Sequence, residues 1–194
     1  RLDTPKAVHI IIKVAKKLPH YEFFIAGKGA IENHLKHLAK DCKNVNFLGS
    51  VSDPLEIISK MDIMVVPSIR EPFGNIIVES GFCKKPVIAS MIDGIPEIIK
   101  NGFNGILIEP SKTISFNKIY KNVLPLPDVV INPKTYELQK PKEIDPLKLR
   151  DSIIKLSSND NIRKLYGQNL YNSVQKKYNI DNYHKEIETI YKKL

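Results

Sequence analysis

The stretch DIMVVPSIREPFGNIIVES, residues 62–80, joins an apolar run to a glycine-containing turn and a second apolar run. Its first six residues predict a strand that is buried on both faces, which is typical of a parallel sheet. A helix is expected to begin near Asn75, directly after Gly74. Glu71 would then lie in the loop before the helix, and Glu79 about one turn into it. The stretch therefore predicts a strand–loop–helix unit with a carboxylate at two points along it.

The same alternation of strands and helices continues on both sides of this stretch. Further strands are expected at 21–26, 45–49, 86–90 and 105–109, and helices at 6–18, 31–42, 96–100 and after a capping Asp53. This spacing predicts an α/β fold with a doubly wound, Rossmann-like parallel sheet. Ligands bind such sheets at the carboxyl ends of the strands. The residues at those ends are Gly27, Gly49, Ser68 and Ser90.

The chain divides into three parts on this pattern. Residues 1–110 form the expected ligand-binding core. Residues 111–148 contain five prolines, which exclude a single helix, and we interpret them as an insertion that includes a hairpin. Residues 149–194 are expected to complete the domain with helices. The last of these helices has an apolar stripe that would cover another domain or pair two copies of the chain: Tyr183, Ile187, Ile190 and Tyr191.

Composition narrows the class of protein. The 194 residues suit one domain, and no run is long and apolar enough to span a bilayer. Two cysteines provide no disulfide framework, so a reducing compartment, the cytoplasm, is expected. The net charge of +9 indicates either attraction to phosphates or a lysine-rich background. Aromatic residues do not interleave with the lysines as in a strand-binding surface, which disfavours nucleic acid as a partner.

The start of the helix after Gly74 predicts an anion site. The amides of Gly74, Asn75 and Ile76 would have no partner within the helix and would point toward a bound phosphate. Carboxylates are poor phosphate ligands, but an ionised carboxylate accepts hydrogen bonds from sugar hydroxyls. Glu71 and Glu79 beside a phosphate site therefore suggest a nucleotide sugar. The alternative is that Glu71 is a solvated loop residue and that Glu79 pairs with a surface lysine.

Six segments resemble the motifs of one protein family and occur in the same order along the chain. They are RLDTPK (1–6), FIAGKG (24–29), VNFLG (45–49), EPFGNIIVE (71–79), DGIPE (93–97) and NGFNGILI (101–108). Together they resemble the C-terminal, donor-binding domain of a retaining glycosyltransferase of family 4, the glycosyl transferases group 1, with the GT-B fold. The sequence departs from the family pattern at Ala7 and Lys84, where glycine is usual.

The resemblance implies a role for each matching position. Arg1 and Lys6 would bind the diphosphate, Glu71 would hold the donor hexose and Glu79 the ribose. Of these, the expected catalytic residues are Arg1, Lys6 and Glu71. The remaining binding positions are those of the turns, the helix start and the base-side strand: Gly27, Gly49, Val51, Phe73, Gly74, Asn75 and Ile76.

The resemblance also sets expectations about ligands and partners. The donor would be a UDP-, GDP- or ADP-sugar, and no cofactor is expected. The chain has no Asp-x-Asp triplet, so no metal is expected either. The acceptor would be a saccharide or a lipid-linked saccharide, as in lipopolysaccharide synthesis at the inner face of a bacterial membrane, with peripheral membrane contact. It would bind an N-terminal domain that precedes Arg1 in the family, so this chain alone is expected not to transfer sugar.

Other classes of protein remain as alternatives. A non-catalytic nucleotide-binding module would need the same phosphate and ribose contacts. A sugar-nucleotide epimerase shares the GT-B fold, although the spacing of Glu71 and Glu79 favours a transferase. A dinucleotide dehydrogenase is disfavoured, because the Gly27–Gly29 turn lacks the third glycine of the dinucleotide-binding motif.

Overall fold

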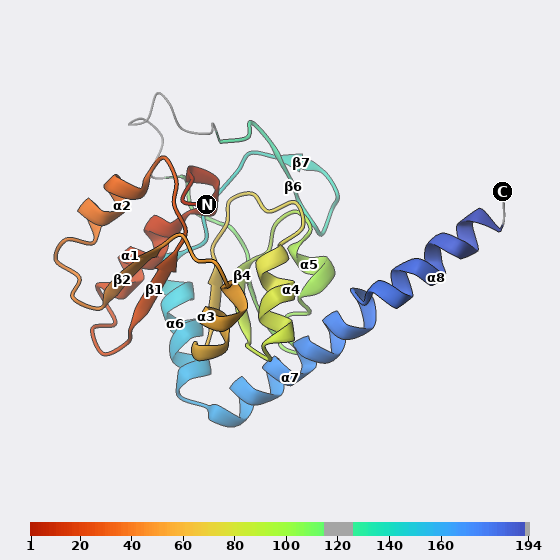
Figure 1. Ribbon diagram of the computed structural model, residues 1–194. Coiled ribbons are helices and arrows are strands. Elements are labelled where there is room, and N and C mark those ends of the chain that lie inside the picture. The colour runs from red at the N-terminus through yellow and green to blue at the C-terminus, as the bar shows by residue number, and fades with distance from the viewer. Residues whose placement is uncertain (115–125, 193–194) are drawn as a thin grey trace.

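The computed structural model describes residues 1–114 and 126–192 of the chain. It has an α/β fold in which all of the longer strands are parallel (Figure 1). The expected single sheet is divided in two. One sheet pairs β1 (Phe23–Ala26) with β2 (Val45–Gly49), and the other has the order β3 (Met64–Val66), β4 (Val87–Ser90), β5 (Gly105–Ile108).

Strand β4 shows how both faces of the larger sheet are covered. Its side chains alternate between two apolar clusters, as the geometry of a strand requires. Ile88 packs into a cluster with α1 (Val8–Ala15) and α6 (Pro146–Ser157). Val87 and Ala89 pack into a second cluster, whose helices are α4 (Asn75–Phe82), α5 (Ile95–Ile98) and α7 (Asp160–Lys177). The sequence predicts burial on both faces for residues 62–67, but in β3 only Val66 is fully buried, and Met64 and Val65 are half-buried. The strand that is buried on both faces is β4.

The smaller sheet has its own core. Ile25 of β1 packs with Ile12 of α1 and Leu35 of α2 (Glu32–Leu38) in a third apolar cluster. Ile31 and Leu35 are fully buried there, and each such side chain contributes about 2 kcal/mol by leaving water. The loop between β2 and β3 holds α3 (Pro54–Lys60), where Asp53 accepts a hydrogen bond from the Glu56 amide at 3.1 Å, so the expected cap is confirmed.

The first helix is shorter than the sequence predicts. A single 3-10 turn, η1 (Thr4–Lys6), precedes it, and the buried Ala7 has φ 50° between the two. This left-handed residue stops η1 from continuing into α1, which begins at Val8 and ends at Ala15. Ala7 occupies the position where the resemblance expects glycine, and left-handed backbone is the reason glycine suits it.

The segment 111–148 contains the expected hairpin. Strands β6 (Val130–Ile131) and β7 (Leu138–Gln139) pair in antiparallel fashion. The backbones of Lys112 and Glu143 bond to each other in both directions, which brings the two ends of the segment together. Pro125, like the rest of residues 115–125, lies outside the described residues.

The C-terminal helices begin at Pro146, slightly earlier than expected, with Asp145 as the cap of α6. Helix α7 lies against α4, and α8 (Ile180–Tyr191) extends away from the body of the molecule (Figure 1). In the expected apolar stripe, Ile190 and Tyr191 are exposed and Ile187 is half-buried, while the side chain of Tyr183 is outside the described part. Whether α8 pairs two copies stays a prediction.

The start of the chain is fixed beside the carboxyl end of β1. The Leu2 amide donates to the Lys28 carbonyl at 3.0 Å. A side chain at Gly29 would place its Cβ 2.3 Å from the Leu2 carbonyl oxygen, so only glycine admits this approach. A strand running parallel to β1 and ending at this point would lead directly into Arg1.

Such a strand has a vacant position between the two sheets. One pocket is lined by residues 24–26 of β1 and also by residues 64–66 of β3, together with Val8 and Ile11 of α1. The common doubly wound order is 3-2-1-4-5-6. Among the described residues, the strands follow that order as β2-β1 and β3-β4-β5, and the pocket lies between β1 and β3, where that order has strand 1.

We therefore expect a short apolar extension ahead of Arg1 to stabilise the protein. Five β-branched residues at that point would pair with the free edges of β1 and β3 and bury apolar surface. The thermal midpoint should rise by about 5 °C or more, since 1 kcal/mol corresponds to about 2–4 °C in a chain of this size. An extension of five alternating glycine and serine residues is the control. Equal midpoints for the two extensions, measured by calorimetry, would contradict the assignment.

Candidate functional site

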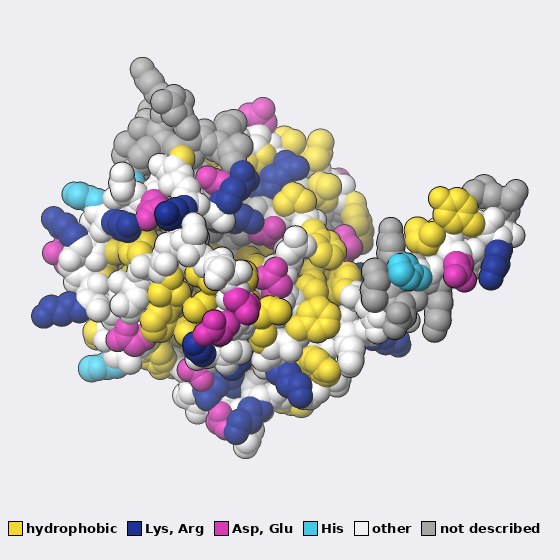
Figure 2. All heavy atoms as spheres, viewed as in Figure 1, with side chains coloured by type: hydrophobic (Ala, Val, Ile, Leu, Met, Phe, Trp, Pro, Cys, Tyr) yellow, Lys and Arg dark blue, Asp and Glu magenta, His cyan; other side chains and the backbone are white. Residues whose placement is uncertain are grey.

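The candidate site lies at the carboxyl edge of the strands, where the same pocket opens. The pocket has a volume of about 390 Å³. One end is polar and the other apolar, and on the face drawn in Figure 2 hydrophobic side chains gather in the middle of the molecule. Seven of the predicted site residues line it: Arg1, Lys6, Gly27, Val51, Glu71, Ile76 and Glu79. The other four, Gly49, Phe73, Gly74 and Asn75, are not part of this lining.

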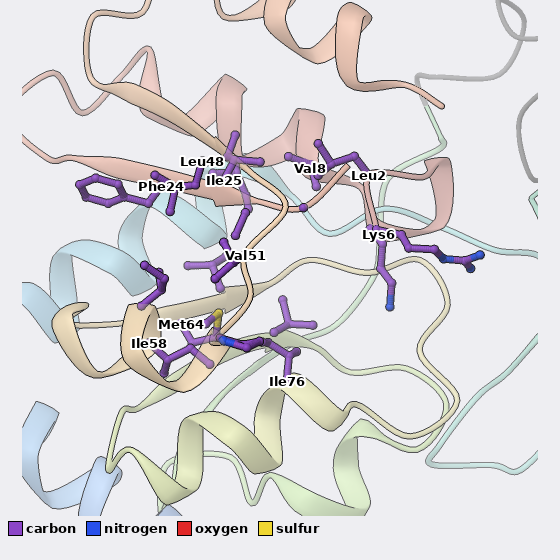
Figure 3. Close-up of a pocket in the computed structure, with 18 of the residues that line it drawn as sticks. Leu2, Lys6, Val8, Phe24, Ile25, Leu48, Val51, Ile58, Met64 and Ile76 are labelled. Carbon is purple, nitrogen blue, oxygen red and sulfur yellow. The ribbon is translucent and has the colours of Figure 1, made fainter. Parts of the chain in front are cut away.

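Glu71 and Lys6 form the ion pair at the polar end. Lys6 Nζ lies 2.5 Å from Glu71 Oε2, and the Ser68 hydroxyl donates to the same oxygen at 3.3 Å. Glu71 is only 8% exposed. The alternative of a solvated loop residue is thereby excluded for Glu71. Figure 3 shows Lys6 extending from η1 into the space between the two sheets.

Arg1 lies at the same rim but is more exposed. Its Nε is 3.0 Å from Asp3 Oδ2, and its side chain is 71% exposed while that of Asp3 is 10% exposed. Both predicted phosphate-binding cations thus already face a carboxylate. A diphosphate bound here would displace or share those carboxylates. Sequence reasoning missed Asp3, whose place in RLDTPK is the only local signal for it.

The start of α4 has the backbone geometry of an anion site. Gly74 precedes it at φ 97°, and the first intrahelical bonds run from the amides of Ile77 and Val78 to the Gly74 carbonyl. The earlier amides, those of Asn75 and Ile76, have no acceptor within the helix. The side chain of Phe73 packs against Tyr178. The centroids of the two rings are 5.4 Å apart and the rings are nearly perpendicular. The predicted binding role of Phe73 therefore receives no support from this geometry.

Glu79 lies on α4 and faces the pocket. It is half-buried, and its carboxylate makes no hydrogen bond or ion pair with residues 1–114 or 126–192. A surface lysine pair, the alternative considered for Glu79, is not found in the described part of the chain. The carboxylate is available to accept hydroxyl hydrogen bonds from a ligand.

The apolar end of the pocket was not predicted. Phe24 of β1 and Leu48 of β2 lie on one side, Met64 of β3 on the other, with Val51 between them (Figure 3). Phe24 and Leu48 are exposed although they belong to strands. Their hydrophobicity is the signal that could have indicated a further packing partner. The Gly27 amide donates to the Gly49 carbonyl at 2.6 Å, which joins the ends of β1 and β2.

No metal site accompanies these groups within the described residues. Histidine, cysteine and acidic side chains there form no cluster of three or more that could hold an ion. The groups around the pocket are two carboxylates, two cations and a helix start. Such a set can hold phosphates and hydroxyls in the same ligand.

Comparison with known proteins decides the family. The family described as "Glycosyl transferases group 1" matches residues 1–124. The chain belongs to this family. Among curated relatives, an uncharacterized glycosyltransferase of Methanocaldococcus jannaschii, MJ1178, is 27% identical over 168 residues, 84% of this chain and 38% of the relative. The lipopolysaccharide core biosynthesis glycosyltransferase LpsE of Rhizobium meliloti is 26% identical over 122 residues, 61% of this chain and 36% of LpsE.

Solved structures agree on the fold of this glycosyltransferase group 1 chain. Anabaena Alr3699/HepE, solved with UDP, has a TM-score of 0.78 at 20% identity and covers all of this chain, which spans 47% of HepE. The C-terminal domain of LpcC, a glycosyl transferase group 1 protein of Francisella tularensis, has a TM-score of 0.67 at 25% identity, with 93% of this chain and 83% of that domain covered. The fold prediction is confirmed: the chain has the fold of the C-terminal domains of GT-B glycosyltransferases.

The chain spans well under half the length of the curated relatives it matches, 38% and 36% for the two above. Its fold and family follow from the comparisons. The activity of the whole protein is taken up below as a proposal.

We expect the Lys6–Glu71 pair to contribute to stability even without ligand. Lys6→Gln should lower the free energy of unfolding by about 1–3 kcal/mol, because it leaves the buried Glu71 carboxylate short of a charged partner. The matched control is Lys60→Gln. Lys60 pairs with Glu56 at 2.6 Å with both side chains 61% exposed, so its loss should change stability by less than about 0.5 kcal/mol. Urea unfolding measures both, and equal effects would show that Glu71 does not need Lys6.

Proposed function

We propose that this chain binds a nucleotide-sugar donor, a UDP-, GDP- or ADP-sugar, as the donor half of a retaining hexosyltransferase. The observation that supports it most is the placement of two carboxylates on either side of one helix start. Glu71 is buried against Lys6 just before α4, and Glu79 faces the same pocket from within α4. A ligand with phosphates in the middle and a sugar at each end matches this arrangement.

The cations and the helix start would hold the diphosphate. Lys6 and Arg1 supply positive charge at the rim, and the amides of Asn75 and Ile76 supply donors aligned with the helix dipole. As the bond to the sugar breaks, negative charge grows on the leaving phosphate. Fixed donors and cations at that point stabilise it, which is the usual way such sites lower a barrier.

The two glutamates would then divide the sugars between them. Glu71 is fixed by Lys6 and Ser68, so its remaining acceptor capacity can orient the hydroxyls of a hexose. Glu79 has no partner within the described residues and would accept the ribose hydroxyls. Gly49 and Val51, at the end of β2, would lie toward the base.

The acceptor would bind outside this chain. We propose a saccharide or lipid-linked acceptor, held by an N-terminal domain of the whole enzyme, so that this chain alone binds donor without transferring it. The relative LpsE, which acts in lipopolysaccharide core biosynthesis, motivates that acceptor class. No helix in the described residues is long and apolar enough to cross a membrane. The basic surface would instead support peripheral contact at the inner face of the cytoplasmic membrane.

A second candidate is a binding module without catalysis. It is favoured by the observation that seven of the predicted site residues line one pocket, which would hold one ligand, the nucleotide sugar. The two candidates differ in the full-length protein: a transferase turns over donor and acceptor, whereas a module only binds the nucleotide.

Substitution of the two glutamates tests the division of labour. Glu79→Gln should weaken nucleoside diphosphate and nucleotide sugar alike, by about tenfold to a hundredfold, because a charged acceptor is lost. Glu71→Gln should leave diphosphate binding within about twofold and weaken only the sugar donor. Calorimetry with UDP, GDP, ADP and their glucose conjugates measures both effects.

Glu97→Gln, an exposed glutamate on α5, is the control and should bind like the parent chain. Equal damage to diphosphate binding from Glu71→Gln and Glu79→Gln would reject the proposed roles.

Nucleotide binding is expected to be independent of divalent metal. Lys6 and Arg1 supply the positive charge that a metal would otherwise bring. Titration of the preferred nucleoside diphosphate should give the same Kd in EDTA and in Mg²⁺ or Mn²⁺. A strict requirement for either ion would sink this prediction.

A further inference from the structure

Asp93 occupies a position that joins the candidate site to the inserted hairpin. It lies in the turn between β4 and α5 and has φ 44°, a left-handed conformation that asparagine, aspartate and glycine tolerate best. Its two carboxylate oxygens accept from two different segments. Oδ2 receives the Glu71 amide at 3.0 Å, and Oδ1 receives the Ile131 amide of β6 at 3.3 Å.

The surrounding backbone packs closely enough to make this contact rigid. A side chain at Gly94 would place its Cβ 2.3 Å from the Pro72 carbonyl oxygen. The 71–73 loop therefore rests directly on the 93–94 turn. On the other side, Val130 is only 3% exposed and packs with Ile92 and Ile95 in one apolar cluster. The turn is held between the Glu71 loop and the hairpin.

We propose that Asp93 is a positioning residue: it clamps the Glu71 loop to hairpin β6–β7 and so fixes the carboxylate of Glu71 in the site. This inference rests on the proposed function in one respect, that Glu71 holds the donor sugar. The physical logic is that Glu71 is restrained at both ends. Its amide is held by Asp93 and its carboxylate by Lys6, so loss of the first contact frees the second to move.

The clamp also assigns a role to hairpin β6–β7. Among the described residues, the Ile131 amide links the hairpin to the turn beside Glu71 through Asp93, and the hairpin's own bonding leaves this amide for that purpose. Asn132 donates to Glu137 within the hairpin at 2.9 Å, and amides alternate in direction along a strand. The Ile131 amide therefore turns away from β7 and toward Asp93. A change in the position of this hairpin would therefore move Glu71, at the end of the site proposed to hold the sugar.

Asp93→Gly removes both acceptors and keeps the turn, because glycine adopts φ 44° without strain. Hydrogen exchange read residue by residue should then speed up about tenfold or more at the amides of Glu71 and Ile131. Asp93→Asn retains one side-chain oxygen as an acceptor. In this variant, one of the two amides, that of Glu71 or that of Ile131, should therefore keep its protection from hydrogen exchange. Tyr136→Gly is the matched control: it places glycine at another left-handed residue, φ 59°, within the hairpin and leaves Asp93 intact.

Ile131→Pro tests the coupling from the other side. Proline has no amide hydrogen, so this variant loses the bond from residue 131 to Asp93 Oδ1. The Glu71 amide keeps Asp93 Oδ2 as its acceptor. If Asp93 links the two segments, exchange at Glu71 should still rise, by less than in Asp93→Gly. An unchanged Glu71 amide in this variant would remove the hairpin from the inference.

Binding of UDP and UDP-glucose completes the test. Asp93→Gly should leave the Kd of UDP within about twofold and reduce the preference for UDP-glucose over UDP by about threefold to tenfold. Unchanged exchange at both amides would overturn the clamp, and faster exchange with an unchanged preference would overturn its positioning role. If the parent chain itself does not distinguish UDP-glucose from UDP, the proposed donor is wrong, while the exchange rates still decide the clamp.

Discussion

The low exposure of the Glu71 carboxylate is the constraint around which the loops of the carboxyl edge are arranged. A buried carboxylate is costly unless charge and hydrogen bonds compensate it. Here Lys6 supplies the charge and Ser68 a hydroxyl, while Asp93 holds the amide of the same residue. These partners come from the first turn of the chain, the end of β3 and the end of β4. The carboxylate and the amide of Glu71 together thus join three separate segments at one place.

The parallel arrangement of the strands makes that meeting possible. In the larger sheet both faces are covered by helices. Val87 and Ala89 are buried in the apolar cluster on one face, and Ile88 is buried in the cluster on the other. Polar and charged side chains cannot be accommodated on such faces without partners. They are left at the strand ends, and the carboxyl ends of parallel strands share one edge. The site follows from the same topology that creates the core.

The pocket has two ends of different chemical character. Its polar end, with Lys6, Glu71 and Glu79, has the groups that a nucleotide sugar needs. Its apolar end, with Phe24 and Met64, lies between two strand edges and has the character of sheet interior. Arg1 and Leu2, which line the same pocket, belong to the segment that passes close to Gly29. The polar groups and the strand edges around the pocket therefore meet at the loop at the start of the chain.

The sequence by itself determined the alternation of strands and helices, the start of α4 after Gly74 and the cap at Asp53. Periodicity, turn residues and capping act over a few neighbouring residues, so they can be read locally. It also indicated Glu71 and Glu79, because their spacing around a helix start has a chemical meaning. Only the tertiary structure decided the partners of these groups. Lys6 and Glu71 are 65 positions apart, and Asp93 is 22 from Glu71. No local pattern encodes such pairs, since they form only when separate strand ends come together at one edge.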